Sequence, residues 1–212
     1  MKPQEIEQES FRIIDREAGP HSFSPQEWQI VRRMIHTTAD FDYLRTVRFH
    51  PNAIPMGLEA LRAGKPIITD THMAASGIRK AELKRFGVAV NCYMDAPGVH
   101  AVARGSGSTR AEAAVDAAVA EMPDAMYVIG NAPTALLRLI ERVRSGEARP
   151  ALIVGLPVGF VNAAESKASL AELDHPYITN TGRKGGSNVA AAVVNALLLL
   201  ALEKEKRVTR NE

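Results

Sequence analysis

The sequence predicts an α/β protein with three α/β/α layers, in which a doubly wound, mostly parallel sheet lies between two layers of helices. Two observations predict this class. Short runs rich in β-branched residues alternate with helical segments along the chain, and such alternation repeated five or more times favours a doubly wound sheet. Most of these runs also lack strict apolar/polar alternation, as expected for strands buried on both faces of a parallel sheet.

The elements follow one another in a simple order. The first 45 residues carry two helical patterns and no convincing strand, which predicts a helical N-terminal extension over residues 1–45. The expected strands cover residues 46–49, 66–69, 88–93, 126–130, 151–155 and 177–180. The expected helices cover residues 53–64, 78–87, 109–122, 132–146, 162–173 and 187–206. No internal repeat or long Pro/Gly/Ser linker is present, so residues 1–212 are interpreted as one domain with a charged tail at 203–212.

The second pattern of the extension, at residues 25–36, is amphipathic. Its apolar face carries Trp28, Val31 and Ile35 at helical spacing. A polar face carries Gln29, Arg32, Arg33 and His36. The spacing therefore predicts that Arg33 and His36 point the same way.

Composition places the chain among soluble globular proteins. Of its 212 residues 46% are apolar and 24% charged, and the formal net charge is only +2. This charge does not predict a positive potential over the whole surface that would attract nucleic acid, so an anionic partner would bind at a local site. The single cysteine, Cys92, excludes disulfide frameworks and cysteine-based zinc sites and favours a reducing compartment.

The chain also lacks the signals of secretion or membrane insertion. Residues 1–17 are acidic and amphipathic, without the apolar core and small-residue cleavage site of a secretory signal. The longest apolar run, 189–202, is 14 residues long, short of the ~20 needed to span a bilayer. It predicts a buried helix, and the protein is expected to be cytoplasmic.

In a doubly wound fold, the ligand-binding and catalytic residues are expected outside the carboxyl ends of the strands. The segments that follow the strands, at 70–77, 131–134, 156–167 and 181–188, are rich in glycine, small hydroxyl residues and amides. The segment 181–188, TGRKGGSN, combines glycines before a helix with Arg183 and Lys184, which predicts a subsite for a carboxylate or phosphate. A glycine-rich turn without a ligand is the alternative. Neither a Walker A nor a GxGxxG pattern is present.

His36 is the first candidate for acid–base chemistry. At a helix C-terminus the dipole favours the imidazolium, whereas Arg32 and Arg33 favour the neutral ring, so the side chain could act as a general acid. On the residues alone, a surface histidine is the favoured interpretation. The other five histidines show no metal-ligand spacing and no GxSxG elbow occurs, so neither a metal site nor a serine hydrolase is predicted.

Five segments taken together resemble a known family. They are ESFRIID (9–15), RMIHTTADFDY (33–43), PIITDTHMAASGI (66–78), VGLPVGFVNAAESK (154–167) and TGRKGGSNVAAA (181–192). In this order they resemble the precorrin-8X methylmutases, or precorrin isomerases, whose anaerobic-pathway members act on cobalt-precorrin-8. The resemblance extends from about residue 5 to about residue 202.

The resemblance implies a fold, an activity and a partner. It implies a homodimeric flavodoxin-like protein of corrin (vitamin B12) biosynthesis with a tetrapyrrole substrate. The reaction would move a methyl group from C-11 to C-12 of the macrocycle, a [1,5]-sigmatropic shift that gives hydrogenobyrinate or, with cobalt, cobyrinate. No separate cofactor would be needed, because any cobalt belongs to the substrate.

The resemblance also assigns residues. It places the active-site histidine at His36 and substrate-contacting residues at Ser10, Arg33 and Arg110. The candidate site further includes Thr37 in the turn after the helix, and the anion-binding candidates Arg183, Lys184, Gly186 and Ser187. We expect His36 to protonate, or hydrogen-bond to, a ring nitrogen next to the migrating methyl group.

Two other functions fit parts of the sequence. A corrinoid carrier that binds the macrocycle without chemistry could use the same anion subsites but would not require His36. A nucleotide-dependent enzyme would need a phosphate fingerprint, which the sequence lacks.

Overall fold

The computed structural model describes residues 2–208. Its strands are β1 (Val47–Phe49), β2 (Ile67–Thr69), β3 (Val90–Cys92), β4 (Met126–Ile129), β5 (Leu152–Gly155) and β6 (Tyr177–Asn180). Its longer helices are α1 (Pro3–Ala18), α2 (Pro25–Thr38), α4 (Ala53–Arg62), α7 (Val99–Ser106), α8 (Arg110–Glu121), α9 (Pro133–Arg144), α10 (Ala163–Ala171) and α11 (Ser187–Val208). Its short helices are α3 (Tyr43–Thr46), α5 (His72–Gly77), α6 (Lys80–Leu83) and the 3-10 turn η1 (Lys84–Phe86).

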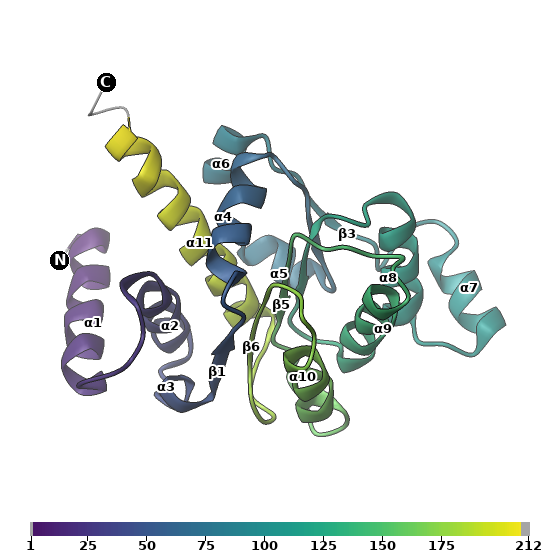
Figure 1. Cartoon of the computed structure of the whole chain (residues 1–212), viewed down its shortest axis with the longest axis horizontal. Coiled ribbons are helices and arrows are strands. Elements are labelled where there is room, and N and C mark those ends of the chain that lie inside the picture. Colours follow the sequence, from purple (N-terminus) through teal and green to yellow (C-terminus); the bar gives the residue numbers. More distant parts are fainter. Residues whose placement is uncertain (1, 209–212) are drawn as a thin grey trace.

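All six predicted strands form one sheet in the order β1-β6-β5-β4-β2-β3. Five of them are parallel, and β1 pairs with β6 in the antiparallel sense at one edge. Without β1, the order is that of a flavodoxin-like sheet, in which the winding direction reverses between β2 and β4. The predicted three-layer, mostly parallel fold is therefore confirmed (Figure 1).

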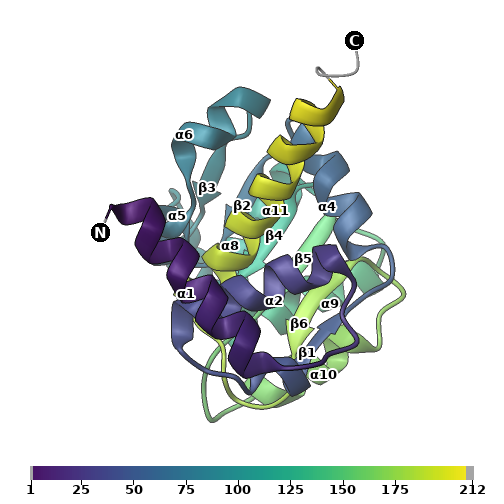
Figure 2. The ribbon, with the colours of Figure 1, turned by 90° about the vertical axis from the view of Figure 1, so that its left-hand side faces the viewer.

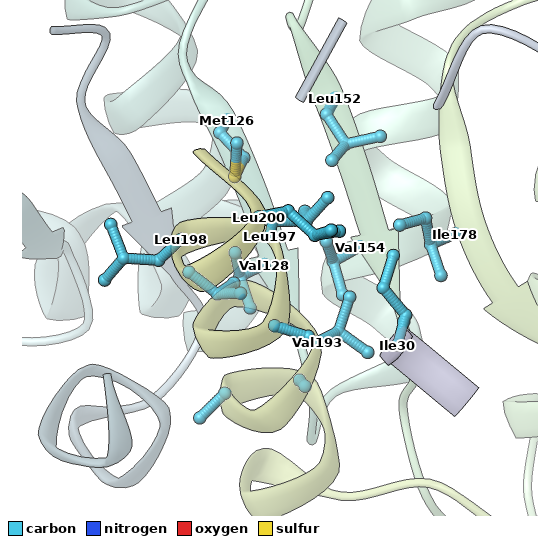
Figure 3. Close-up of a cluster of buried hydrophobic side chains, with 14 of the residues drawn as sticks. Ile30, Met126, Val128, Leu152, Val154, Ile178, Val193, Leu197, Leu198 and Leu200 are labelled. Carbon is cyan, nitrogen blue, oxygen red and sulfur yellow. The ribbon is translucent and has the colours of Figure 1, made fainter. Parts of the chain in front are cut away.

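Each face of the sheet buries its own apolar core. Alternate strand residues, among them Met126, Val128 and Val154, pack against α2, α4 and α11. Figure 3 shows Val193 and Leu197 of α11 against this face of the sheet. The remaining strand residues pack against α8, α9 and α10 on the other face. Since both faces are covered, β4 and β5 are buried throughout, which explains their unbroken apolar sequences.

The N-terminal region is less of an extension than the sequence predicted. Ser24 and Glu27 form a capping box that starts α2, and the helix then buries Ile30, Met34 and Ile35 in the core that it shares with α11. Helix α2 therefore belongs to one layer of the fold, and α1 lies outside it as an added layer (Figure 2).

Short helices account for most differences from the predicted elements. Helices α3, α5 and α7 were not predicted, and the expected helix 78–87 is divided into α6 and η1. Helix α11 continues to Val208, so much of the predicted charged tail is helical, while residues 209–212 lie outside the described part. Among residues 2–208, no helix is both long and apolar enough to cross a membrane.

Candidate active site

The C-terminal turn of α2 and the facing side of α1 line an open cavity of about 450 Å³. It is lined by Ser10, Ile13, Ile14, Glu17, Ile35, His36, Ala39 and Phe41. Two predicted site residues, Ser10 and His36, thus meet at one cavity. The Ser10 hydroxyl donates to the Ile6 carbonyl oxygen (2.9 Å), which leaves its oxygen able to accept a further hydrogen bond.

Polar and aromatic contacts hold α1 against α2. The Asp15 carboxylate accepts one hydrogen bond from Trp28 Nε1 and one from Arg32 Nη1, both at 2.9 Å. Phe11 packs between the helices, with its ring centroid 5.1 Å from that of His36 and 4.4 Å from Cζ of Arg32. These contacts fix the wall of the cavity that faces His36.

Arg33 shares a helix face with His36, as the spacing predicted. Its Cζ lies 5.2 Å from the Phe11 ring centroid, on the ring that also packs against His36. Its guanidinium donates to Glu7 (3.1 Å), and the side chain is only 14% exposed. Arg33 lines a neighbouring cavity of about 160 Å³ rather than that of His36, so its contact with substrate stays a prediction.

The loop 181–186, which is the part of the predicted anion-binding segment 181–188 that precedes α11, lies against the turn that follows His36. Lys184 Nζ is 2.6 Å from Oδ2 of Asp40 and 2.6 Å from Oδ2 of Asp42. Two motifs far apart in the sequence are therefore adjacent in space. Thr37 is exposed at the end of α2, and its role in binding stays a prediction.

The crevice where the winding reverses contains a buried carboxylate that sequence reasoning missed. Asp70 directly follows β2 and is 6% exposed. It accepts hydrogen bonds from the backbone N–H groups of Gly130, Asn131 and Ala132 at 2.9, 2.7 and 2.8 Å. Burial raises the pKa of Asp70, and these amide bonds act in the opposite direction. An aspartate directly after a predicted inner strand was the available signal.

The start of α11 packs closely over the ends of β4 and β5. A Cβ atom at Gly130 would lie 2.7 Å from the Ser187 Cα, and one at Gly185 would lie 2.2 Å from the Leu156 carbonyl oxygen. The Gly186 N–H donates to that same oxygen (2.9 Å), so this amide is engaged within the protein.

Ser187 is likewise engaged at the carboxyl end of β2. Its Oγ lies 2.8 Å from Oγ1 of Thr71, the residue whose side chain caps α5. The Ser187 side chain is largely buried. Binding of substrate by Gly186 and Ser187 stays a prediction.

Lys167 is a second buried polar residue that the sequence did not reveal. It is 1% exposed, and its ammonium donates to the Lys184 carbonyl oxygen (2.6 Å) and the Asn180 side-chain oxygen (3.2 Å). Within residues 2–208 its hydrogen bonds and ion pairs include no carboxylate. Burial lowers the pKa of Lys167 to about 8.

This burial predicts a pH-dependent penalty. Because the folded pKa lies below the usual 10.5, the cost of burying the ammonium is present below pH 8 and is relieved as pH rises toward 10.5. We expect Lys167→Met to raise the free energy of unfolding by about 1 kcal/mol at pH 7, with the gain shrinking by pH 10. Urea denaturation at both pH values measures it, and a variant equally destabilised at both would contradict the prediction.

Arg110 and Arg183 lie apart from the His36 cavity. Arg110 is the first residue of α8, which packs on the opposite face of the sheet from α2 (Figure 1), and its Nη1 lies 3.4 Å from Nε2 of His100. Arg183 is exposed, with its Cζ 5.5 Å from the centroid of the Phe160 ring. One chain does not bring these two arginines to the cavity walls.

The segments HMAASG (72–77) and LPVGFVN (156–162) follow β2 and β5 and contain both buried and exposed apolar residues. HMAASG forms helix α5 rather than a loop, with Met73 72% exposed. Phe160 and Val161 are 85% and 77% exposed in the loop before α10. Their contact with a ligand stays a prediction. Among the described residues, no group of three or more His, Cys, Asp or Glu side chains could hold a metal ion.

The arrangement suits proton transfer to a partly apolar ligand. An imidazole, a hydroxyl and a carboxylate face a cavity whose other walls are apolar, and the nearby loops carry no phosphate-binding pattern. Fold and site thus define a doubly wound α/β protein with a candidate acid–base centre on its helical layer.

Comparison with known proteins defines the family. The sequence pattern described as "Precorrin-8X methylmutase" matches residues 5–200. The chain is 49% identical to the cobalt-precorrin-8 methylmutase of Salmonella typhimurium, over 93% of this chain and 95% of that one. It is 40% identical to the precorrin-8X methylmutase of a Sinorhizobium species, over 91% and 92%. The crystal structure of the Thermus thermophilus precorrin-8x methyl mutase superposes with a TM-score of 0.86 at 50% identity, covering 94% of this chain and 98% of that one. The chain belongs to the precorrin-8X methylmutase family.

Proposed function

We propose that the protein is an isomerase of corrin biosynthesis that moves a methyl group from C-11 to C-12 of precorrin-8X or its cobalt form. The observation that carries the proposal is the cavity at which His36 meets Ser10, in a chain of the methylmutase family. Substrate and product are isomers, so the reaction consumes no co-reactant. Such an enzyme would work in the cytoplasm.

His36 would act as the general acid. It would donate a proton or hydrogen bond to a ring nitrogen beside the migrating methyl group, and take it back once the methyl is bound to C-12. General acid assistance is worth ~10²–10⁴-fold. Further acceleration would come from holding the macrocycle in a reactive geometry, with Ser10 and the apolar walls as contacts.

The substrate is proposed to be precorrin-8, and the names of the relatives favour neither its metal-free nor its cobalt form. The Salmonella relative, named for the cobalt substrate, is 49% identical to the chain, and the Thermus protein, named for precorrin-8x, is 50% identical. The macrocycle would hold any cobalt, and no separate cofactor is proposed. Incubation with metal-free and cobalt-containing precorrin-8, followed by product absorption, tests both points. A corrinoid carrier would shift the spectrum of the added substrate without forming product.

We further propose a homodimer in which two chains complete each site. A precorrin carries several carboxylates, yet among the described residues that line the cavity only His36 has a side chain that can be a cation. Arg33 is paired with Glu7, and Arg110 is on the other face of the sheet. A second copy could bring its own Arg110 to the open side of the cavity, as isologous dimers permit.

Mixing two inactive variants tests the shared site. We expect His36→Ala and Arg110→Ala each to lose most turnover as separate preparations. After unfolding and refolding together, statistical pairing of chains should restore about a quarter of wild-type activity, because mixed dimers regain one intact site. The double variant refolded with itself is the control. A monomer by analytical ultracentrifugation, or no recovery in the mixture, would contradict the shared site.

A further inference from the structure

The turn that follows His36 forms part of the cavity wall. Ala39 and Phe41 line the cavity beside His36. Ala39 ends α2 in the left-handed conformation, with φ of 52°, which a residue with a Cβ atom adopts at a steric cost. The Asp42 N–H donates to Asp40 Oδ1 (3.0 Å) and tightens the turn. A conformation of this kind persists where surrounding contacts hold it.

Lys184 supplies such contacts and is itself held at both ends. Its side-chain Nζ bonds to Asp40 and Asp42 at 2.6 Å each. Its carbonyl oxygen accepts from the buried Lys167 ammonium (2.6 Å) and from Asn180 Nδ2 (2.9 Å). The backbone of Lys184 is therefore fixed from inside the protein, while its side chain reaches out to the turn.

The charges around Lys184 are balanced within the protein. Asp42 also accepts from Arg45, so the cluster Lys184, Arg45, Asp40 and Asp42 contains two cations and two carboxylates. Hydrogen bonds from Lys184 and then Arg45 lower the pKa of Asp42, and those from Asp40 and Asp42 raise the pKa of Lys184. The carboxylates match the cations in number, so the cluster has no surplus cation for a substrate carboxylate.

We propose that Lys184 is a positioning residue that clamps the turn 39–42 beside His36 to the loop 181–186, and that it does not bind substrate carboxylate. This replaces the anion-binding role predicted from the sequence. The inference rests on the proposed function, because His36 is the group whose placement the clamp controls. A histidine displaced by about 1 Å can lose up to ~10²-fold in rate.

A thermodynamic cycle tests the clamp. The variants are Lys184→Met, the pair Asp40→Asn with Asp42→Asn, and all three changes together. We expect Lys184→Met to lower kcat about tenfold, with the dissociation constant of hydrogenobyrinate within about twofold of wild type. The combined variant should lose no more than Lys184→Met alone, because residues acting through one contact are not additive. Lys65→Met, which removes a similar pair with Asp124, is the matched control.

The opposite role gives opposite results. If Lys184 bound a substrate carboxylate, Lys184→Met would weaken product binding about tenfold or more. The aspartate variants would free the ammonium and tighten product binding. Either outcome, or additive losses in kcat, would overturn the proposal.

The His36 ring gives a readout that does not depend on turnover. We expect Lys184→Met and the aspartate pair to displace the His36 Cε1–Hε1 NMR resonance alike, and Lys65→Met to leave it in place. An unmoved resonance in Lys184→Met overturns the clamp even where the wild type is active. A wild type inactive on both forms of precorrin-8 refutes the proposed function, while the resonance still tests the clamp.

Discussion

Replacement of His36 by alanine is expected to lower the rate of methyl migration by at least about 100-fold while the protein stays folded. His36 is exposed and lines the cavity with Ser10, so its loss removes the proposed proton donor without opening the core. Affinity for hydrogenobyrinate should stay within about threefold of wild type, because an interaction made mainly in the transition state contributes little to product binding. Absorption spectra measure both the conversion and the binding.

Two controls separate chemistry from structure in this experiment. His21→Ala removes another histidine at the N-terminal side of α2, where its ring centroid is 4.1 Å from that of Trp28, and should leave kcat unchanged. The melting temperature of His36→Ala should match wild type. Conversion at near wild-type rate would show that another group supplies the proton, and product affinity lost together with rate would make His36 a binding residue.

Local sequence was enough to predict the strands of the sheet but not the short helices. The strands were predictable because β4 and β5 are covered on both faces, so burial and sequence pattern agree. Helix α5 has only six residues and includes serine and glycine, both weak helix formers. The Thr71 cap and packing against α11 stabilise it, and neither is readable from six residues.

The residues of the candidate site also divide into those that could be predicted from local sequence and those that could not. The motif resemblance assigned roles to Ser10 and His36, and the structure places both residues at one cavity. The pairing of Lys184 with Asp40 joins residues 144 positions apart, and no local pattern encodes it. Lys167 lies in a polar helical stretch, where lysine normally indicates a solvated face. The loop that contains Lys184 covers it in the folded protein, and its ammonium becomes a buried hydrogen-bond donor.

Asp70 connects the two strands between which the winding reverses. It follows β2, and its carboxylate accepts from three successive amides that follow β4. The Gly130 bond is buried, and the other two are partly buried. Amides left unsatisfied in such a place cost about 1–3 kcal/mol each. A single side chain therefore stabilises the start of the segment 130–132, over which the N-terminus of α11 packs.

Asp70→Ala is accordingly expected to lower the free energy of unfolding by about 3–5 kcal/mol, out of the ~5–15 kcal/mol typical of a folded domain. The free energy of unfolding of Asp70→Asn should fall between those of wild type and Asp70→Ala, since asparagine keeps one acceptor oxygen but turns an NH₂ group toward the remaining amides. Asp124→Ala removes a carboxylate that is 61% exposed and bonded to Lys65, and should cost no more than about 1 kcal/mol. Urea denaturation with an unchanged m-value measures all three. Equal losses for Asp70→Ala and Asp124→Ala would mean that water replaces the carboxylate at the three amides, and that the contact between β2 and β4 does not depend on this side chain.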